Sequence, residues 1–343
     1  MLIPGDPLPR FRAWHPDNPH YAVDSAAGRY LAIAVLSGAD DATVEREVER
    51  ARANRARFND VHASLFVLMP DTPEWRDRVR DEVPGLRWLF DDGTARKALQ
   101  VEADVRWIVS DPALRVMGLA GPDEADRLLG QIGALPPPER HAGASTPAPV
   151  LVLPRVFEPE LCQALIAHYE AVGGEESGFM REIDGKTRLV NDARHKKRSD
   201  VMLETPDLIG ATRARISRRL APMVEKAFQF KPTRIERYLV ACYDASTGGY
   251  FRPHRDNTTA GTAHRRFAVS INLNHDFSGG DLRFPEFGPQ TYRPPLGGAV
   301  VFSCSLLHEA TAVTKGRRYA FLPFLYDEAA AKVREENMRF VEA

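Results

Sequence analysis

The chain has 343 residues, of which 43% are hydrophobic and 27% charged, and its formal net charge at pH 7 is −1. This length favours two domains with packed cores, and the composition excludes wholesale disorder, collagen and coiled coil. Near-neutral charge gives no global field to attract nucleic acid or an anionic membrane. The apolar runs are far short of a membrane span, the start has no secretory signal pattern, and three scattered cysteines make no disulfide framework. We therefore expect a cytoplasmic protein.

Residues 135–149 are rich in proline, alanine, glycine and serine and contain almost nothing to bury. Such a composition is typical of an exposed, semi-rigid linker. The sequence therefore predicts a first domain over residues 1–134, this linker, and a second domain over residues 150–343.

Before the linker, short apolar runs alternate with helical patterns. Residues 30–36 and 64–69 are apolar runs typical of strands buried on both faces, and the charged segment 40–58 between them predicts a helix. Residues 105–109 and 115–119 then predict a hairpin. Strand, helix, strand and ribbon together predict a small α/β layer fold.

This first part also resembles a known fold family. Residues 2–11, 28–35 and 107–116 are similar to the opening and the final hairpin of a peroxiredoxin-type, thioredoxin-like domain. That family needs a thiolate just after the first buried strand, where this chain has Ser37, and all three cysteines lie beyond residue 160. Without a thiol there is no nucleophile for peroxide or disulfide chemistry. We therefore expect a scaffold that either docks a protein or forms a homo-oligomer, and not a thiol peroxidase.

After the linker, helices give way to short strands. Residues 159–172 predict a helix with an apolar stripe, and residues 206–228 predict a second helix. Strand-like segments separated by glycine and proline turns follow at 235–243, 267–273, 282–284, 299–302 and 319–326. Short strands preceded by helices predict a helix-supported β-sandwich or jelly roll.

Two histidines and one aspartate in this β region form a candidate metal site. His254 and Asp256 are two residues apart, so in an extended segment their side chains point to the same side, and His308 follows about fifty residues later. Two imidazoles and one carboxylate are the ligands of the facial triad in non-haem Fe(II) oxygenases. Cys304, four residues before His308, is expected to be a buried hydrophobe and not a ligand.

The surrounding motifs resemble the Fe(II)- and 2-oxoglutarate-dependent dioxygenases of the prolyl 4-hydroxylase-like branch. The motifs stand in order at residues 243–256, 270–274, 277–284, 295–302 and 308–319, and the likeness covers about residues 150–328. It implies a double-stranded β-helix, or jelly roll. It also implies Fe(II), 2-oxoglutarate and O₂ as cofactors and cosubstrates, possible binding of ascorbate, and hydroxylation of a C–H bond with release of succinate and CO₂.

Carried over residue by residue, the resemblance implies His254, Asp256 and His308 as the metal ligands. It implies Arg318, ten positions after the last histidine, as the anchor of the distal carboxylate of 2-oxoglutarate. A guanidinium suits this role because its planar fork binds a carboxylate through two hydrogen bonds. Tyr243 matches the tyrosine near the cosubstrate, and Asn272 stands where relatives often have a second tyrosine.

Strand alternation supports this placement without the family. In residues 269–274, Val269, Ile271 and Leu273 share one face of the predicted strand, and the polar residues between them share the other. A polar face pointing into a barrel is expected where a polar ligand binds. Arg317 and Arg318 are adjacent, so only one of them can enter the barrel.

The basic stretch from Arg188 to Arg198 has two interpretations. We expect a solvated loop, and the alternative is a lid over the active-site mouth. Two further functions stay open beside the hydroxylase: a catalytically idle binding protein, and a nucleic-acid demethylase. The demethylases have a second arginine six residues after the cosubstrate arginine, where this chain has Phe324. The substrate stays open between protein, peptide, free amino acid and small metabolite.

Overall fold

The structure is a computed structural model that describes residues 1–342. It divides into two compact units, one formed by residues 1–148 with 285–289, and the other by residues 149–284 with the remainder of the chain from residue 290. Each unit has its own apolar core. Over the described residues, none of the helices has both the length and the apolar composition needed to cross a bilayer.

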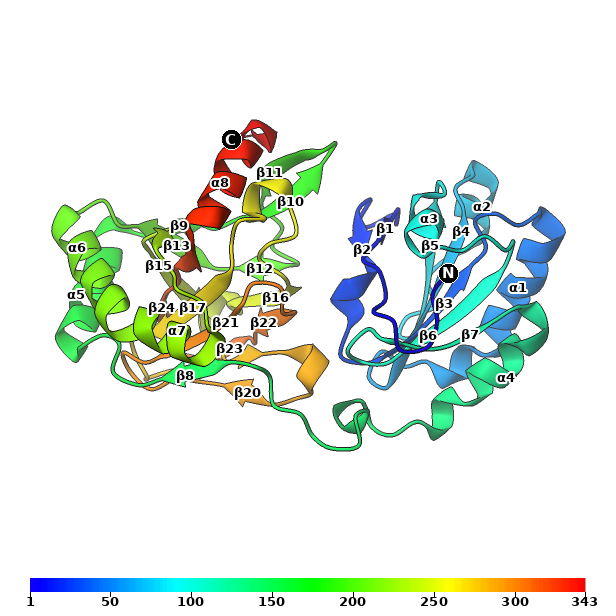
Figure 1. Ribbon diagram of the computed structural model, residues 1–343, viewed down its shortest axis with the longest axis horizontal. Helices are drawn as coiled ribbons and strands as arrows, with labels where there is room; N and C mark the ends of the chain where they lie inside the picture. The colour runs from blue at the N-terminus through cyan, green and yellow to red at the C-terminus, as the bar shows by residue number, and fades with distance from the viewer. Residues whose placement is uncertain (343) are drawn as a thin grey trace. The chain divides into compact units, whose positions relative to one another are not determined.

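The first unit is built on a five-stranded sheet (Figure 1). The strand order is β5-β4-β3-β6-β7, in which β3, β4 and β5 run parallel while β6 and β7 are antiparallel to their neighbours. The strands are β3 (Tyr30–Val35), β4 (Ala63–Pro70), β5 (Leu86–Asp91), β6 (Arg106–Ser110) and β7 (Val116–Ala120). Every residue of β3 is buried, as its apolar run predicted, so this strand lies at the centre of the core.

Short helices and a small ribbon complete the first unit. The helix predicted over residues 40–58 is α1 (Asp41–Ala53) followed by a 3₁₀ turn (Arg55–Arg57). It begins where the carboxylate of Asp40 accepts a hydrogen bond of 2.8 Å from the backbone N–H of Thr43. The other elements are β1 (Arg12–Ala13), β2 (Tyr21–Ala22), α2 (Pro73–Arg78), α3 (Thr94–Ala98) and α4 (Ala125–Gly130).

The second unit is a double sheet of jelly-roll type. The larger sheet has the order β14-β25-β17-β24-β15-β13-β9, with β21 and β8 added beside β17, and the smaller has the order β12-β16-β22-β19-β20. Leu239, Ala241 and Tyr243 of the larger sheet pack with Phe251 and Ala310 of the smaller, so the two sheets face each other. The site lies between these facing sheets.

The bounds of its strands follow from the structure. The larger sheet and its extension contain β8 (Leu151–Leu153), β9 (Glu175–Glu176), β13 (Ser199–Met202), β14 (Arg234–Glu236), β15 (Leu239–Asp244), β17 (Phe267–Asn272), β21 (Ala299–Ser303), β24 (Arg317–Phe321) and β25 (Phe324–Tyr326). The smaller sheet contains β12 (Lys196–Lys197), β16 (Tyr250–His254), β19 (Leu282–Arg283), β20 (Thr291–Tyr292) and β22 (His308–Ala310), and a separate pair is β18 (Ser278–Gly279) with β23 (Val313–Lys315).

Helices cover the outer face of the larger sheet (Figure 1). The first is α5 (Pro159–Val172), with the predicted bounds. The predicted helix 206–228 consists of α6 (Pro206–Arg215), a π-helical turn (Ile216–Leu220) and α7 (Ala221–Phe228). Their apolar residues share one core with Val240, Val269 and Ile271 of the sheet. A last helix, α8 (Glu328–Asn337), follows the strands.

The basic stretch 188–198 is folded and is not a solvated loop. It begins in a hairpin of β10 (Phe179–Ile183) and β11 (Lys186–Val190), to which β26 (Val341–Glu342) adds a third strand. Lys196 and Arg198 are only 4% and 7% exposed. Lys196 Nζ donates hydrogen bonds to Ser177 and Gly178, and Arg198 pairs with Asp200, so these two basic side chains belong to the interior.

Candidate metal and carboxylate site

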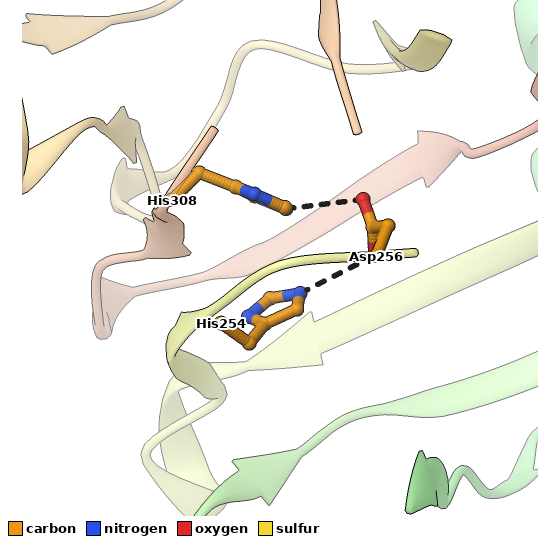
Figure 2. Close-up of side chains that lie close together, drawn as sticks. All are labelled: His254, Asp256 and His308. Carbon is orange, nitrogen blue, oxygen red and sulfur yellow. Dashed lines mark ion pairs between the residues drawn. The ribbon is translucent and has the colours of Figure 1, made fainter. Parts of the chain in front are cut away.

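The structure brings the three predicted ligands together. The imidazoles of His254 and His308 both point at the carboxylate of Asp256 (Figure 2). His254 Nε2 lies 3.6 Å from Asp256 Oδ1, and His308 Nε2 lies 3.4 Å from Asp256 Oδ2. One donor atom from each residue falls within 4.8 Å of the other two. This spacing fits three ligands around a single ion.

Backbone pairing and local hydrogen bonds aim the two histidines. His254 ends β16 and His308 begins β22, and the two residues are directly opposite in the antiparallel ladder. The Nδ1 of His254 lies 2.7 Å from the carbonyl oxygen of Arg252, and that of His308 lies 3.1 Å from that of Leu306. If Nδ1 donates the proton to each carbonyl, Nε2 is left with its lone pair, which is the state a metal ligand requires.

The charge states also suit a cation. Burial, with the neighbouring His254, lowers the pKa of His308 to about 4, so its ring is neutral at pH 7. Burial alone would raise the pKa of Asp256, but the imidazoles of His308 and His254 hold it well below its usual range. An ionised carboxylate and a neutral imidazole are the forms that bind a divalent metal. The donor set therefore fits Fe(II), and three ligands leave open positions.

A buried ion pair supports the loop that carries Asp256. The guanidinium of Arg265 binds Glu236 at 2.6 Å and 3.0 Å, and its Nη1 also donates to the backbone oxygen of Asp256 at 3.4 Å. His264 Nε2 lies 2.7 Å from the same glutamate and is 2% exposed. Because His264 flanks a turn in the sequence, it is expected to be solvated; this expectation is wrong, because Glu236 supplies a buried partner that lies far away in the sequence.

We predict that Glu236→Gln destabilises the second unit. Arg265 would keep a buried charge without its counter-ion, which costs about 3–5 kcal/mol, and the midpoint of thermal unfolding falls by roughly 10 °C. Burial alone would raise the pKa of Glu236, but His264 and Arg265 hold it well below its usual range. Its stabilising contribution is therefore present above the unfolded pKa of about 4.5 and is lost as the pH falls further.

Thermal unfolding between pH 3 and 8 checks this expectation. Glu225, exposed on α7, provides the matched control Glu225→Gln, which should leave the curve unchanged. A Glu236→Gln variant as stable as the wild type at pH 7 would contradict the role of this ion pair.

Arg318 enters the space between the sheets, and Arg317 points outward. Arg318 is 2% exposed, and it donates from Nη2 to Ser270 Oγ at 2.7 Å and from Nε to Asn272 Oδ1 at 3.1 Å. Among residues 1–342, no carboxylate forms an ion pair with it, whereas the half-exposed Arg317 pairs with Asp244 and Glu170. A buried guanidinium bound only to neutral acceptors is suited to take the carboxylate of a ligand.

Tyr243 and Asn272 both lie beside Arg318. Tyr243 is opposite Arg318 in the β15–β24 ladder, and the guanidinium carbon of Arg318 lies 5.4 Å from its ring centre. Asn272 is 2% exposed and also donates to the carbonyl of Pro294 at 3.0 Å, so it holds the arginine in place. Arg198 donates to the Tyr243 hydroxyl at 3.4 Å, a contact that no motif or spacing in the sequence predicts.

All three cysteines are free and buried, and Cys304 contacts the backbone of the metal-binding loop. Its carbonyl oxygen accepts a hydrogen bond of 3.0 Å from the backbone N–H of Asp256. Burial raises the pKa of its thiol well above the usual value. It therefore stays protonated, as a buried hydrophobe does.

Comparison with known proteins agrees with this geometry. Residues 238–326 match the family model of the 2OG-Fe(II) oxygenase superfamily, so the chain contains a 2OG-Fe(II) oxygenase domain, of a family that uses Fe(II), 2-oxoglutarate and O₂. A PKHD-type hydroxylase of Pseudomonas fluorescens (strain Pf0-1) is 34% identical over 117 residues, which are 32% of this chain and 49% of that protein. A PKHD-type hydroxylase of Synechococcus sp. (strain JA-2-3B'a(2-13)) is 30% identical over 97 residues, 26% of this chain and 42% of that protein. The chain thus spans less than half the length of these curated relatives.

The solved structures that match this chain do so at lower sequence identity. A Pseudomonas putida prolyl-4-hydroxylase has a TM-score of 0.40 at 17% identity, covering 52% of this chain and 94% of that one. A Trichoplax adhaerens prolyl hydroxylase in complex with a hypoxia inducible factor peptide has a TM-score of 0.41 at 17% identity, covering 55% and 86%.

Proposed function

We propose that the oxygenase domain is a 2-oxoglutarate-dependent hydroxylase. It would hydroxylate a C–H bond of a prolyl or other amino-acid-type substrate, either free or within a peptide or protein. The observation that carries the proposal is the convergence of His254, Asp256 and His308 beside a buried Arg318 that lacks a carboxylate partner. When bound, Fe(II) and 2-oxoglutarate supply the oxidation, in which O₂ gives one oxygen atom to the substrate and one to succinate as CO₂ leaves.

The chain's own residues bind and orient. His254 and His308 present Nε2, while their Nδ1 groups are held by backbone carbonyls, and Asp256 supplies the negative charge. Arg318 fixes the far carboxylate of 2-oxoglutarate so that its oxo-acid end is directed toward the triad. Ser270 and Asn272 hold the guanidinium in position before the cosubstrate arrives. The burial of these groups excludes water, which strengthens each charged contact.

The experiment that tests this function is the formation of succinate. Protein loaded with Fe(II) under anaerobic conditions, then given 2-oxoglutarate and O₂, should release succinate slowly without a substrate and faster with one. Fe(II) binding is measured in parallel. A protein that neither binds Fe(II) nor forms succinate would support the idle binding protein instead.

The stretch from Arg188 to Arg198, which begins in β11, is a proposed lid over the substrate entrance. Its support is the exposed, basic character of Arg188 and Arg194, whose side chains are 42% and 76% exposed. We predict that Arg188→Ala with Arg194→Ala raises the substrate KM by about threefold to tenfold, as expected for surface charges that attract a ligand. The KM for 2-oxoglutarate should not change, and an unchanged substrate KM would refute the lid.

The first unit is proposed to dock a partner protein or a second copy of the chain. Its support is a side chain just after β3. Ser37 Oγ donates a hydrogen bond of 2.7 Å to Asp91, at the position where a peroxiredoxin-like domain needs its thiolate. The three cysteines all lie in the other unit and are buried. Docking requires no redox chemistry from this unit. We propose that it takes place in the cytoplasm.

A further inference from the structure

Arg237 is connected to the loop that carries Asp256 through Phe324 and Arg265, although no motif marks it. It connects β14 to β15, and its backbone φ of 67° interrupts the strand there. Its guanidinium carbon lies 4.9 Å from the ring centre of Phe324, and that of Arg265 lies 4.1 Å from the same ring. Because Arg265 donates to the backbone oxygen of Asp256, Arg237 is separated from the metal loop by one ring and one side chain.

Arg237 has no counter-ion. Its neighbours Arg198 and Arg265 are each bound through two hydrogen bonds to Asp200 and Glu236. No carboxylate of the described chain pairs with Arg237, and its Nε is shielded from solvent without any hydrogen-bond acceptor. The residue as a whole is of intermediate exposure, so part of it remains open to solvent. An unsatisfied, largely desolvated cation costs stability and is typical of a site that waits for a charged ligand.

The charge balance favours a ligand with a single negative charge. Burial, with Arg265 and Arg198 nearby, lowers the pKa of Arg237 to about 10, so it remains a cation at pH 7. Burial and Arg198 lower the pKa of Lys196 to about 6, so this neighbouring amine is mostly neutral. Arg237 is then the one uncompensated charge of the group. A guanidinium fork and one net charge suit a carboxylate better than a phosphate dianion.

We propose that Arg237 binds a carboxylate of the substrate and so selects an acidic substrate for the oxygenase site. The proposal rests on the hydroxylase function above. Two sources share this chemistry: the α-carboxylate of a free amino acid, and a carboxylate of a peptide. Arg237 is thus a specificity-determining residue separate from Arg318, which serves the cosubstrate.

The first test needs no substrate. Acetate is titrated against chloride at constant ionic strength, and the unfolding midpoint is followed in the wild type, Arg237→Leu, Arg318→Leu and Arg234→Leu. Arg234 is an exposed residue on the adjacent strand and provides the matched control. Acetate should raise the midpoint by about 2 °C or more in the wild type and the control. A shift should persist in Arg318→Leu and shrink in Arg237→Leu.

The same curves separate ligand binding from a structural role. Without acetate, Arg237→Leu should be as stable as the wild type or more so, because the unpaired charge is gone and an apolar side chain still covers Phe324. Arg237→Gln repeats the test with a polar side chain if the leucine variant does not fold. An undiminished acetate shift in Arg237→Leu, or a midpoint several degrees lower without acetate, would overturn the proposal.

Acid and amide pairs then identify the source of the carboxylate. L-proline is compared with L-prolinamide, and peptides ending in proline are compared as acids and as amides. Succinate formation above the wild-type basal level is the readout. The acid of a pair should have at least a tenfold lower KM than its amide, and Arg237→Gln should remove that difference. Equal stimulation by acid and amide overturns the proposal, whereas wild-type protein that forms no succinate and binds no Fe(II) refutes the hydroxylase function instead.

Discussion

Replacing His308 by alanine should abolish Fe(II) binding and, with it, succinate formation. His308 supplies one of the three predicted protein ligands. Its side chain is only 6% exposed, so we expect no other side chain to take its place as a ligand. Loss of a residue that only supports a ligand already weakens metal binding by about 10–100-fold. Loss of the ligand itself should therefore reduce Fe(II) affinity by more than about 100-fold. Calorimetric titration with Fe(II) under anaerobic conditions measures this directly.

His275 provides the matched control for that experiment. It is a histidine of the same unit, but its side chain is exposed and outside the triad. His275→Ala should bind Fe(II) and form succinate like the wild type. If His308→Ala retained Fe(II) affinity within a few-fold of the wild type, the facial triad would not be the iron site.

The residues that sequence reasoning found are those fixed by local spacing or strand alternation. His254 and Asp256 are two residues apart, and Arg318 follows His308 by ten, so a short length of chain connects the two members of each pair. The alternation of residues 269–274 placed Ser270 and Asn272 on the polar face, and both bind Arg318 in the structure. Alternation of polar and apolar residues predicts which side chains face the interior, because all side chains on one side of a strand meet the same environment.

What could not be predicted depends on contacts between distant segments. His264 is expected to be solvated because it flanks a turn, yet Glu236 contacts it from β14. Lys196 and Arg198 have the sequence pattern of a solvated basic loop. They are buried because β12 pairs with β16 of the smaller sheet and β13 pairs with β15 of the larger sheet. Arg237 gave no signal, since its position depends on the interruption between β14 and β15. Buried charges are decided by tertiary partners, which propensity and periodicity do not contain.

Replacing Arg318 by leucine should raise the KM for 2-oxoglutarate by about 30-fold or more. Removing one partner of a buried charge pair costs about 2 kcal/mol or more of binding free energy, which corresponds to this change in KM. Arg317→Leu is the matched control, because Arg317 is the adjacent residue but pairs with Asp244 and Glu170 on the outside, where such pairs contribute about 0–1 kcal/mol. Its KM for 2-oxoglutarate should stay within about twofold of the wild type.

A cosubstrate analogue tests the same contact from the ligand side. 2-Oxopentanoate has the oxo-acid end of 2-oxoglutarate but no distal carboxylate, so the wild type should discriminate strongly against it. Arg318→Leu should lose most of that discrimination, because the apolar end of the analogue no longer faces an unpaired guanidinium. Since Fe(II) affinity depends on the triad, it should be retained in this variant, which separates cosubstrate binding from metal binding. A larger effect in Arg317→Leu than in Arg318→Leu would mean that the other face of β24 carries the cosubstrate.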